Sequence, residues 1–322
     1  FDPTGRLLAR SPHPILMQRP RENHAEHDST DIWNAVCIAV KTALADAGIL
    51  PQSVDAIGFD ATCSLVIRDA RGEPVSVSVT GEDRFDTIVW LDHRAIGEAD
   101  RLTASGHRVL DFAGNSVSPE MQMPKLMWLK AHMPASWARM SFAFDLADFL
   151  TWKATGSAQR SNCTQTAKWN FLAQENPGWQ ADYLELASLA DLRERAGLPE
   201  TTVMPGDSIG PLSSEAAAEL GLDTGCQVAA GMIDAYAGAL GDMSVGIGAR
   251  YVGPYYYNVY NNSGRSPGQT YVDASFSYAV TDSTDLTVNV SNIFDEQYVV
   301  GQGTAAYYNN GRTITAALRH SW

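Results

Sequence analysis

The architecture of this chain is predicted best by one segment, Gln227-Val228-Ala229-Ala230-Gly231-Met232-Ile233-Asp234-Ala235-Tyr236-Ala237-Gly238-Ala239-Leu240-Gly241. Its first half has the apolar residues of a buried strand, and its second half has the small residues of a helix that begins at a carboxylate. Functional sites in open α/β sheets gather at the carboxyl ends of such strands. The segment therefore predicts a layered α/β domain in which Asp234 lies where chemistry is expected.

The composition of the chain changes at the end of this segment. All four cysteines and every lysine precede Gly241, whereas ten of the twelve tyrosines follow it. A single globular domain rarely divides its composition so sharply. We therefore expect two unrelated pieces, residues 1–241 and residues 242–322.

The bulk composition argues against several classes of protein. With 322 residues and 45% hydrophobic content, the chain has enough apolar side chains for a real core. The net charge is −14, and residues 1–242 contain 19 Lys and Arg against 32 Asp and Glu, so neither nucleic acid nor anionic lipid is an expected partner of this piece. The cysteines form no CxxC pair, which predicts reduced thiols rather than a disulfide framework or a zinc site.

Residues before residue 227 alternate between predicted helices and strands. A helix is predicted from Ser29 to a stop at Gly48, and strands are predicted over residues 56–60, 65–67 and 87–90. The last of these strands delivers the polar group Leu91-Asp92-His93-Arg94 to its carboxyl end. This alternation is typical of a layered α/β domain.

The chain starts without a recognisable leader. A tight turn at Asp2-Pro3-Thr4-Gly5, followed by Leu7-Leu8-Ala9, predicts a β-hairpin. No basic stretch followed by an apolar run marks a targeting segment, and no run of 18 apolar residues occurs. We expect the first strand of the domain to lie upstream of Phe1.

Six short motifs in residues 1–241 resemble those of one family. They are Phe59-Asp60-Ala61-Thr62-Cys63-Ser64, Val89-Trp90-Leu91-Asp92-His93-Arg94-Ala95, Ser118-Pro119-Glu120-Met121-Gln122-Met123-Pro124-Lys125-Leu126, Phe144-Asp145-Leu146-Ala147-Asp148-Phe149-Leu150, Cys163-Thr164-Gln165-Thr166-Ala167-Lys168-Trp169 and Gly231-Met232-Ile233-Asp234-Ala235. In this order they resemble the N-terminal half of the FGGY carbohydrate kinases, and most closely the ribulokinase-like pentulose kinases. The resemblance implies a ribonuclease-H-like, actin-type domain that holds the sugar, and a second such domain that completes the ATP site.

The resemblance gives Asp234 the role of catalytic base. The family transfers the γ-phosphoryl group of ATP to a hydroxyl of a small-molecule sugar, a reaction that depends on placement and electrostatics. Gly and Ala around Asp234 leave room for a sugar hydroxyl to reach the carboxylate. On local spacing alone, the competing interpretation is that Asp234 only caps the following helix.

The same resemblance suggests six further residues of the sugar pocket. Asp92, Glu120 and Lys168 are candidates for contacts to sugar hydroxyls, and the alternative for each is an exposed ion pair. Thr62 and Cys63 match positions that line the pocket, although packed cysteines are common after strands. Arg94 either contacts the substrate or holds Asp92 in place. Three tryptophans either wall the pocket or belong to the core: Trp90, Trp128 and Trp169.

The phosphate-binding elements of the family have no counterpart in this sequence. The first phosphate-binding turn would precede Phe1, and the Gly-Thr-Ser loop and the adenine-binding domain would follow Gly241. Neither GxxxxGK[ST] nor GxGxxG replaces them, since Gly246-Ile247-Gly248 lacks the third glycine. We therefore expect that this chain does not bind the ATP and Mg²⁺ that the intact family uses, that it is inactive as a kinase, and that it has no metal site of its own.

Apolar residues alternate with polar or small residues throughout the last piece. Val272, Ala274 and Phe276 illustrate the pattern, which returns over residues 286–291 and 313–322. This period of two predicts an antiparallel β-meander of about four strands. The same alternation occurs in outer-membrane barrels and in water-soluble sandwiches.

Four segments of the last piece carry a second resemblance: residues 248–253, 271–274, 289–299 and 311–322. They resemble the C-terminal strands of TonB-dependent outer-membrane receptors, especially siderophore receptors, and the most specific part is Asn292-Ile293-Phe294-Asp295-Glu296-Gln297-Tyr298. In that family the terminal aromatic residue helps to direct barrel insertion, a role that Trp322 would take. About four strands cannot close a barrel, so a membrane is an expected partner only within a complete barrel. Three interpretations stay open: a cytoplasmic kinase sugar domain, a fragment of an outer-membrane receptor, and a non-functional fusion of the two.

Overall fold

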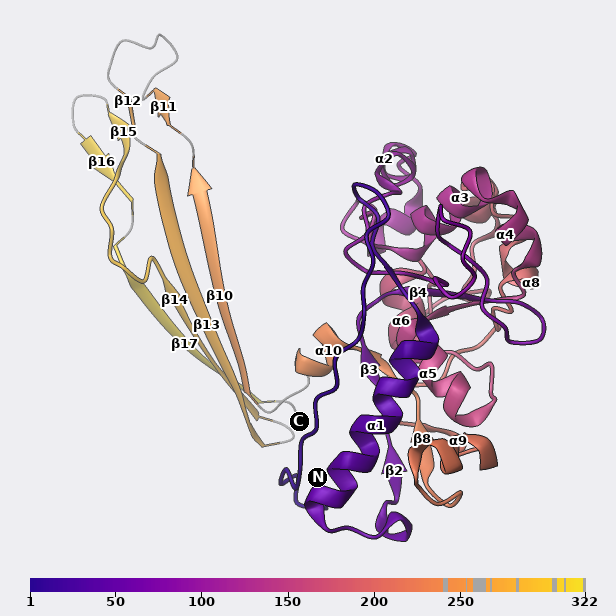
Figure 1. Ribbon diagram of the computed structural model, residues 1–322. Coiled ribbons are helices and arrows are strands. Elements are labelled where there is room, and N and C mark those ends of the chain that lie inside the picture. Colours follow the sequence, from indigo (N-terminus) through magenta and orange to yellow (C-terminus); the bar gives the residue numbers. More distant parts are fainter. Residues whose placement is uncertain are drawn as a thin grey trace. The chain divides into compact units, whose positions relative to one another are not determined.

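The computed structural model describes residues 1–239, 243–252, 254–256, 265–266, 268–281, 284–302, 306–309 and 311–320 (Figure 1). The chain divides into two compact units, Phe1–Ala237 and Gly238–Trp322. The predicted boundary residue Gly241 and the terminal aromatic Trp322 lie outside the described residues.

The first unit mixes helices and short strands, as the α/β prediction requires. In chain order its elements are β1 (Glu26–His27), α1 (Ser29–Ala47), β2 (Ala56–Ile57), β3 (Asp60–Ala61), β4 (Leu65–Arg68), β5 (Thr87–Ile88), α2 (Ile96–Ala104), α3 (Gln122–His132), α4 (Pro134–Arg139), β6 (Phe142–Asp145), α5 (Leu146–Thr155), α6 (Asn162–Lys168), α7 (Ala181–Leu186), α8 (Leu192–Arg195), β7 (Ser208–Pro211), α9 (Ser214–Leu220), β8 (Gln227–Ala229), β9 (Met232–Ile233) and α10 (Asp234–Ala239). Two 3₁₀ helices, Pro51–Ser53 and Arg108–Phe112, complete it.

Helix ends follow the capping residues of the sequence. The Asp28 carboxylate accepts hydrogen bonds from the Thr30 and Asp31 backbone N–H groups and starts α1, which ends at Gly48 in the left-handed conformation. Ser213 starts α9 in the same way, and Gly221 ends it. The predicted N-terminal hairpin is wrong: the turn at residues 2–5 forms, but residues 1–16 contain no strand, and Asp2 instead caps the turn through Thr4 and Arg6.

The sheet β1-β5-β4-β6 is buried on both faces. Leu65 and Ile67 of β4 pack into a core with α2, α3 and α7, whereas Val66 between them packs into a second core with α1, α5 and α9. Successive strand residues point to opposite faces, so the apolar run Leu65-Val66-Ile67 of β4 predicts cover on both sides. The first unit is therefore layered, with helices on each face of this sheet.

Parallel strand pairs bring residues far apart in the sequence together. β2 pairs with β8, and β3 pairs with β9 in the register Asp60 to Met232 and Ala61 to Ile233. Both β3 and β9 run in the same direction, so the residues that follow them, Thr62 and Asp234, lie at one end of the pair. This pairing positions the candidate site.

The second unit is an antiparallel sheet in the order β10-β13-β14-β17, with two short two-stranded additions. Its strands are β10 (Met243–Val252), β11 (Tyr255–Tyr256), β12 (Arg265–Ser266), β13 (Gln269–Thr281), β14 (Thr284–Ser291), β15 (Val299–Gln302), β16 (Ala306–Tyr308) and β17 (Thr313–His320). The predicted meander of about four strands is confirmed by this sheet.

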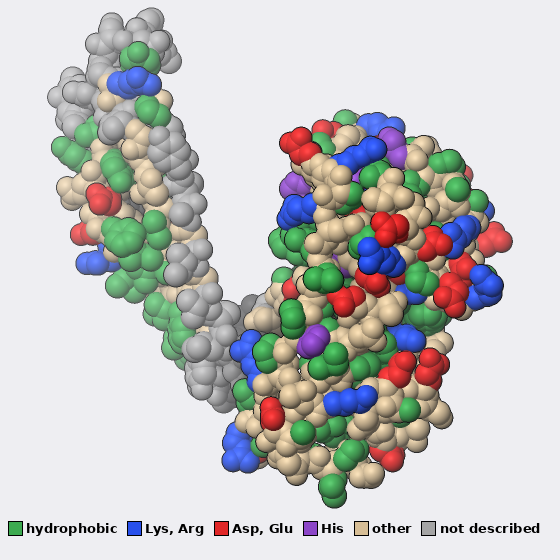
Figure 2. Space-filling model, viewed as in Figure 1, with side chains coloured by type: hydrophobic (Ala, Val, Ile, Leu, Met, Phe, Trp, Pro, Cys, Tyr) green, Lys and Arg blue, Asp and Glu red, His purple; other side chains and the backbone are tan. Residues whose placement is uncertain are grey.

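The two faces of this sheet differ in polarity. Register places Ala274, Val290 and Ile314 side by side on one face, and Phe276, Val288 and Ala316 beside them. The opposite face carries rows such as Ser275, Asn289 and Thr315. Ile314 and Leu318 are 66% and 69% exposed, and hydrophobic side chains gather along this unit in Figure 2. Within the described residues, no helix is long and apolar enough to cross a membrane.

Candidate functional site

Asp234 begins α10 directly after β9, and its side chain is exposed. Its Oδ1 accepts a hydrogen bond from the Ala235 backbone N–H at 2.8 Å. Thr62 follows the paired strand β3, is half-buried, and shares a hydrogen bond of 3.0 Å with the Ser64 hydroxyl. The Asp234 carboxylate is thus open to a ligand from solution while it also contacts its own helix.

A pocket of about 730 Å³ adjoins this end of the strands. Its wall includes Lys168 at the end of α6, Cys163 at the start of α6, and Tyr236 from α10. Tyr236 lies two residues after Asp234, so the exposed carboxylate belongs to the same short helix that edges the pocket. Burial raises the pKa of the Cys163 thiol, and a hydrogen bond with the Ile233 backbone offsets part of that rise.

Lys168 connects this pocket with the loop after β3. Cys63 of that loop is buried, and burial raises the pKa of its thiol, while the nearby positive charge of Lys168 and a hydrogen bond from Lys168 lower it. Three of the residues suggested by the sequence, Thr62, Cys63 and Lys168, are therefore assembled with Asp234 around one end of the β3–β9 pair.

Asp92 and Arg94 lie in a buried ion-pair network. The Asp92 carboxylate accepts hydrogen bonds from the Ala25 backbone N–H at 2.6 Å and from Arg94 Nε at 2.9 Å. Arg94 also donates to Glu26 Oε1 at 2.8 Å and to the Val77 carbonyl at 2.7 Å. Of the two roles considered for Arg94, this geometry supplies the one that holds Asp92 in place. Contacts of either residue with sugar stay a prediction.

Glu120 is half-buried in the loop before α3 and faces His93, with 3.8 Å between Glu120 Oε1 and His93 Nε2. Its sugar contact also stays a prediction.

Among the three tryptophans, Trp169 is fully buried and Trp128 is 8% exposed beneath the Arg94 guanidinium, so both belong to the core. Trp90 is 39% exposed and is the one able to meet a ligand.

A buried polar cluster behind the site was not singled out by the sequence analysis. Gln122 and Lys125 of α3 and Asp145 at the end of β6 are all fully buried. Burial lowers the pKa of Lys125 to about 8, and burial raises the pKa of Asp145 well above its usual range, assisted by the nearby Asp148. The signal that could have found them is the spacing of Gln122 and Lys125, which are three residues apart on one helix face.

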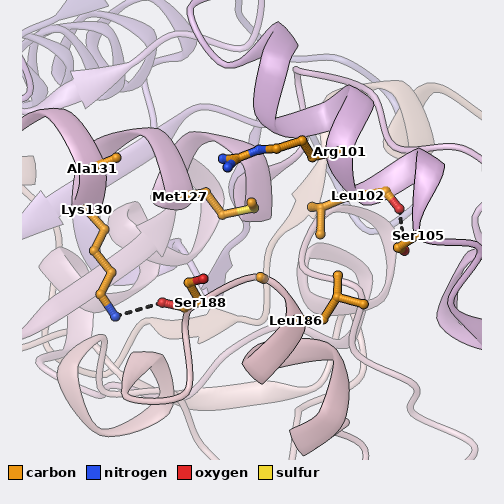
Figure 3. A pocket seen from close by; sticks show the side chains of 9 residues that line it. Arg101, Leu102, Ser105, Met127, Lys130, Ala131, Leu186 and Ser188 are labelled. Carbon is orange, nitrogen blue, oxygen red and sulfur yellow. Dashed lines mark hydrogen bonds between the residues drawn. The ribbon is translucent and has the colours of Figure 1, made fainter.

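A second pocket, of about 440 Å³, lies between α2, α3 and the residues after α7 (Figure 3). Its apolar floor contains Leu102, Met127 and Leu186. The one lysine on its wall, Lys130, is already bonded to the Ser188 carbonyl at 2.8 Å and to Asp191 at 2.7 Å. This pocket contains none of the predicted site residues.

In the described part of the chain, no group of three or more His, Cys, Asp or Glu side chains is arranged to hold a metal ion. Among these residues, the surroundings of Asp234 accordingly present no such ligand set for Mg²⁺.

Known proteins match the first unit. The sequence model of the FGGY family of carbohydrate kinases, N-terminal domain, matches residues 1–241. An FGGY carbohydrate kinase domain-containing protein of Danio rerio is 42% identical over 243 residues, which is 74% of this chain and 44% of that protein. The D-ribulokinase of Saccharomyces cerevisiae is 37% identical over 259 residues, covering 76% of this chain and 36% of that protein. The chain thus spans less than half the length of either relative.

Solved structures agree on the fold. The xylulose kinase from Rhodospirillum rubrum has a TM-score of 0.60 at 22% identity, covering 85% of this chain and 51% of that one. The pyoverdine outer membrane receptor FpvA from Pseudomonas aeruginosa PAO1 covers 26% of this chain at 33% identity with a TM-score of 0.23, too low to support a shared fold. On the strength of residues 1–241, this chain belongs to the FGGY family of carbohydrate kinases.

Proposed function

We propose that residues 1–241 bind a pentulose in the pocket beside Lys168 and that, in a whole kinase, Asp234 accepts the proton of the sugar hydroxyl that receives the phosphoryl group. The observation that carries the proposal is the pocket of about 730 Å³, because Lys168 lines its wall and Tyr236 of the Asp234 helix forms its edge. A lysine ammonium can donate up to three hydrogen bonds to sugar oxygens. The 37% identity to a D-ribulokinase favours a pentulose.

The roles of the remaining residues follow from their exposure. Thr62, Glu120 and Trp90 are accessible enough to meet the sugar directly. Asp92, Arg94 and Cys63 are buried and would act from behind, by fixing the chain segments that carry the accessible groups. ATP supplies the transferred phosphoryl group in the family.

Sugar binding is tested by isothermal titration of the full chain with D-ribulose. We expect binding by the unsubstituted chain. Lys168→Met should weaken it about tenfold or more, because a hydrogen bond to a charged group contributes about 1.5–3 kcal/mol. Asp234→Asn, which keeps the shape of the side chain, should bind within a few-fold of the parent. Lys153→Met is the matched control, since Lys153 pairs with Glu215 away from this pocket. Absence of binding by the unsubstituted chain, or binding by Lys168→Met with the affinity of the unsubstituted chain, would contradict the proposal.

We also propose that residues 1–322 alone do not transfer phosphate. Residues 242–322 contain no Gly-Thr-Ser sequence, which is the second phosphate loop that the family resemblance implies, and the family match covers residues 1–241. Sugar-dependent ATP consumption that disappears in Asp234→Ala would overturn this proposal. We also propose that residues 1–241 act in the cytoplasm.

A second candidate concerns residues 242–322, as the last strands of a TonB-dependent outer-membrane receptor. The sheet with one apolar and one polar face favours it, because lipid-facing and inward-facing residues alternate in such strands. Recovery of the chain in outer-membrane fractions with heat-modifiable mobility would support it, and recovery only in the cytosol would count against it.

A non-functional fusion of the two pieces is the remaining proposal, since a cytoplasmic kinase and an exported receptor act in different compartments. No Lys or Arg lies between Arg195 and Arg250, so trypsin should release residues 196–250 as one peptide across the junction. Detection of that peptide in native cells would show that the joined chain is made.

A further inference from the structure

The first turn of α3 places two polar side chains in the protein interior. Gln122 and Lys125 are three residues apart, so they project from the same face of the helix, and each has no exposed surface. A buried ammonium group is costly and is retained in proteins where it has a specific partner. The partners of these two residues are therefore informative.

Gln122 fixes the segment that follows β3. Its Nε2 donates to the Cys63 carbonyl at 3.2 Å and to Asp145 Oδ2 at 2.8 Å. The remaining oxygens of this pair, Gln122 Oε1 and Asp145 Oδ1, are buried without a hydrogen-bond partner in the described part of the chain. The amide group of Gln122 thus joins α3 and the end of β6 to the peptide that carries Thr62 and Cys63.

Lys125 fixes the segment that follows β5. Its Nζ donates to the Val89 carbonyl at 3.2 Å, directly before Trp90. The titratable groups that act on its pKa are Cys63, Asp92, Asp145 and Lys168. The Trp90 backbone N–H in turn donates to the Ser64 hydroxyl at 3.1 Å. The two segments are therefore tied to each other as well as to α3.

These two segments carry the accessible residues of the candidate site. Thr62 and Trp90 are partly exposed, and Cys63 lies against Lys168. Neither Gln122 nor Lys125 lines the pocket that contains Lys168. These two residues would therefore act on a ligand indirectly, through the loops that they hold and, for Lys125, through its charge near Lys168.

We propose that Gln122 and Lys125 are positioning residues of the sugar site, which hold the Thr62–Cys63 and Val89–Trp90 peptides from behind so that Thr62, Trp90 and Lys168 face one ligand. This inference rests on the proposed binding of sugar by residues 1–241. Loss of either side chain should move the loops without removing a direct contact to the sugar.

The test compares D-ribulose affinity with stability in the full chain. Lys125→Met and Gln122→Met keep side-chain length and remove the hydrogen bonds to the two carbonyls. We expect each to weaken D-ribulose binding about tenfold, as for loss of a well-placed group, while thermal unfolding remains cooperative. Leu129→Val, a core substitution on the same helix, should lower the midpoint temperature of unfolding with little change in affinity. Lys130→Met should leave affinity unchanged, because Lys130 bonds to Ser188 and Asp191 instead.

Hydrogen exchange of the Trp90 amide provides a readout that does not depend on sugar. This amide should exchange faster in Lys125→Met and Gln122→Met than in Leu129→Val. Parental affinity in both Lys125→Met and Gln122→Met, or a loss of affinity in Leu129→Val as large as theirs, would overturn the inference. If the unsubstituted chain binds no pentulose, the proposed function fails; faster Trp90 exchange would then still support the holding of the loops, and unchanged exchange would refute it.

Discussion

Several charged side chains are buried in the first unit, and their partners determine how each contributes to stability. Arg68 pairs with Asp86 at 3.0 Å, Arg94 pairs with Asp92 and Glu26, and Lys125 has only carbonyl and long-range partners among the described residues. Removal of one member of a buried pair is strongly destabilising because the other charge is left behind. Lys125 has no such close partner, so its removal leaves no unpaired partner charge and also removes the cost of burying its own charge.

Lys125→Met should change how stability depends on pH. The pKa of Lys125 is lowered by burial from 10.5 to about 8 in the folded chain. Between these two pH values the unfolded chain binds more protons, so the contribution of Lys125 makes the folded state more stable as pH rises from about 8 to about 10.5, by at most about 3 kcal/mol. Below pH 8 the cost of the buried charge is fully present. Urea unfolding of parent and Lys125→Met at pH 7 and pH 9.5 measures the difference.

The variant should gain stability relative to the parent at pH 7, and that advantage should shrink at pH 9.5. The buried thiols of Cys37 and Cys226, whose pKa values are raised, oppose the trend equally in both proteins and cancel in the comparison. The Cys63 thiol does not cancel, because the Lys125 charge lowers its pKa in the parent alone. An advantage of the variant that is equal at both pH values would show that Lys125 does not titrate in this range.

The sequence indicates the identity of site residues better than their surroundings. Asp234 and Lys168 were found through motifs, and their exposure agrees with a site role. The burial of Arg94 could not be predicted, because its partner Glu26 is 68 residues away and local spacing carries no record of it. Trp169 and Trp90 likewise look alike in sequence, and only packing against the core separates them.

At the level of elements, the close approach of β9 to its neighbours places Asp234. Gly231 lies between β8 and β9, and a Cβ added there would be 2.7 Å from the Phe59 carbonyl oxygen and 3.2 Å from the Ala147 Cβ. Both neighbours are held, the first in the β3 segment and the second in α5. Glycine therefore allows the β3–β9 pair to form against α5.

Gly231→Ala should separate these elements. We expect a loss of about 1–3 kcal/mol in the free energy of unfolding, typical of overpacking in a core, together with weaker D-ribulose binding. Gly238→Ala in α10 is the control, because an added Cβ there meets nothing within 4 Å in the described structure. The control should be neutral or slightly stabilising, since alanine favours helix. Equal stability of the two variants in urea would argue against the tight β9 junction.

Elements with strong local signals were predicted well. α1 has a side-chain cap at one end and glycine at the other, and the structure places it where the sequence predicts it. The strands near the site are two to four residues long, so their bounds depend on tertiary pairing rather than on periodicity. The N-terminal hairpin failed for the same reason, because a turn alone does not supply a partner strand.

For the whole molecule, the two units behave as separate pieces of structure. The first has two packed cores, and the second has a sheet whose apolar face includes highly exposed Ile314 and Leu318. An exposed apolar sheet face is an aggregation liability or a contact surface. All the residues proposed for the sugar site lie in the first unit, so sugar binding should depend on that unit alone.

The most direct measurement is the rate of alkylation of Cys163 by N-ethylmaleimide, followed by mass spectrometry with and without D-ribulose. Cys163 lines the Lys168 pocket and is half-buried, whereas Cys37, Cys63 and Cys226 are buried and serve as internal references. If the pentulose occupies this pocket, D-ribulose near the parental Kd should slow Cys163 modification measurably, and Lys168→Met should lose most of that protection at the same sugar concentration. Modification of Cys163 at the same rate with and without D-ribulose would contradict the account.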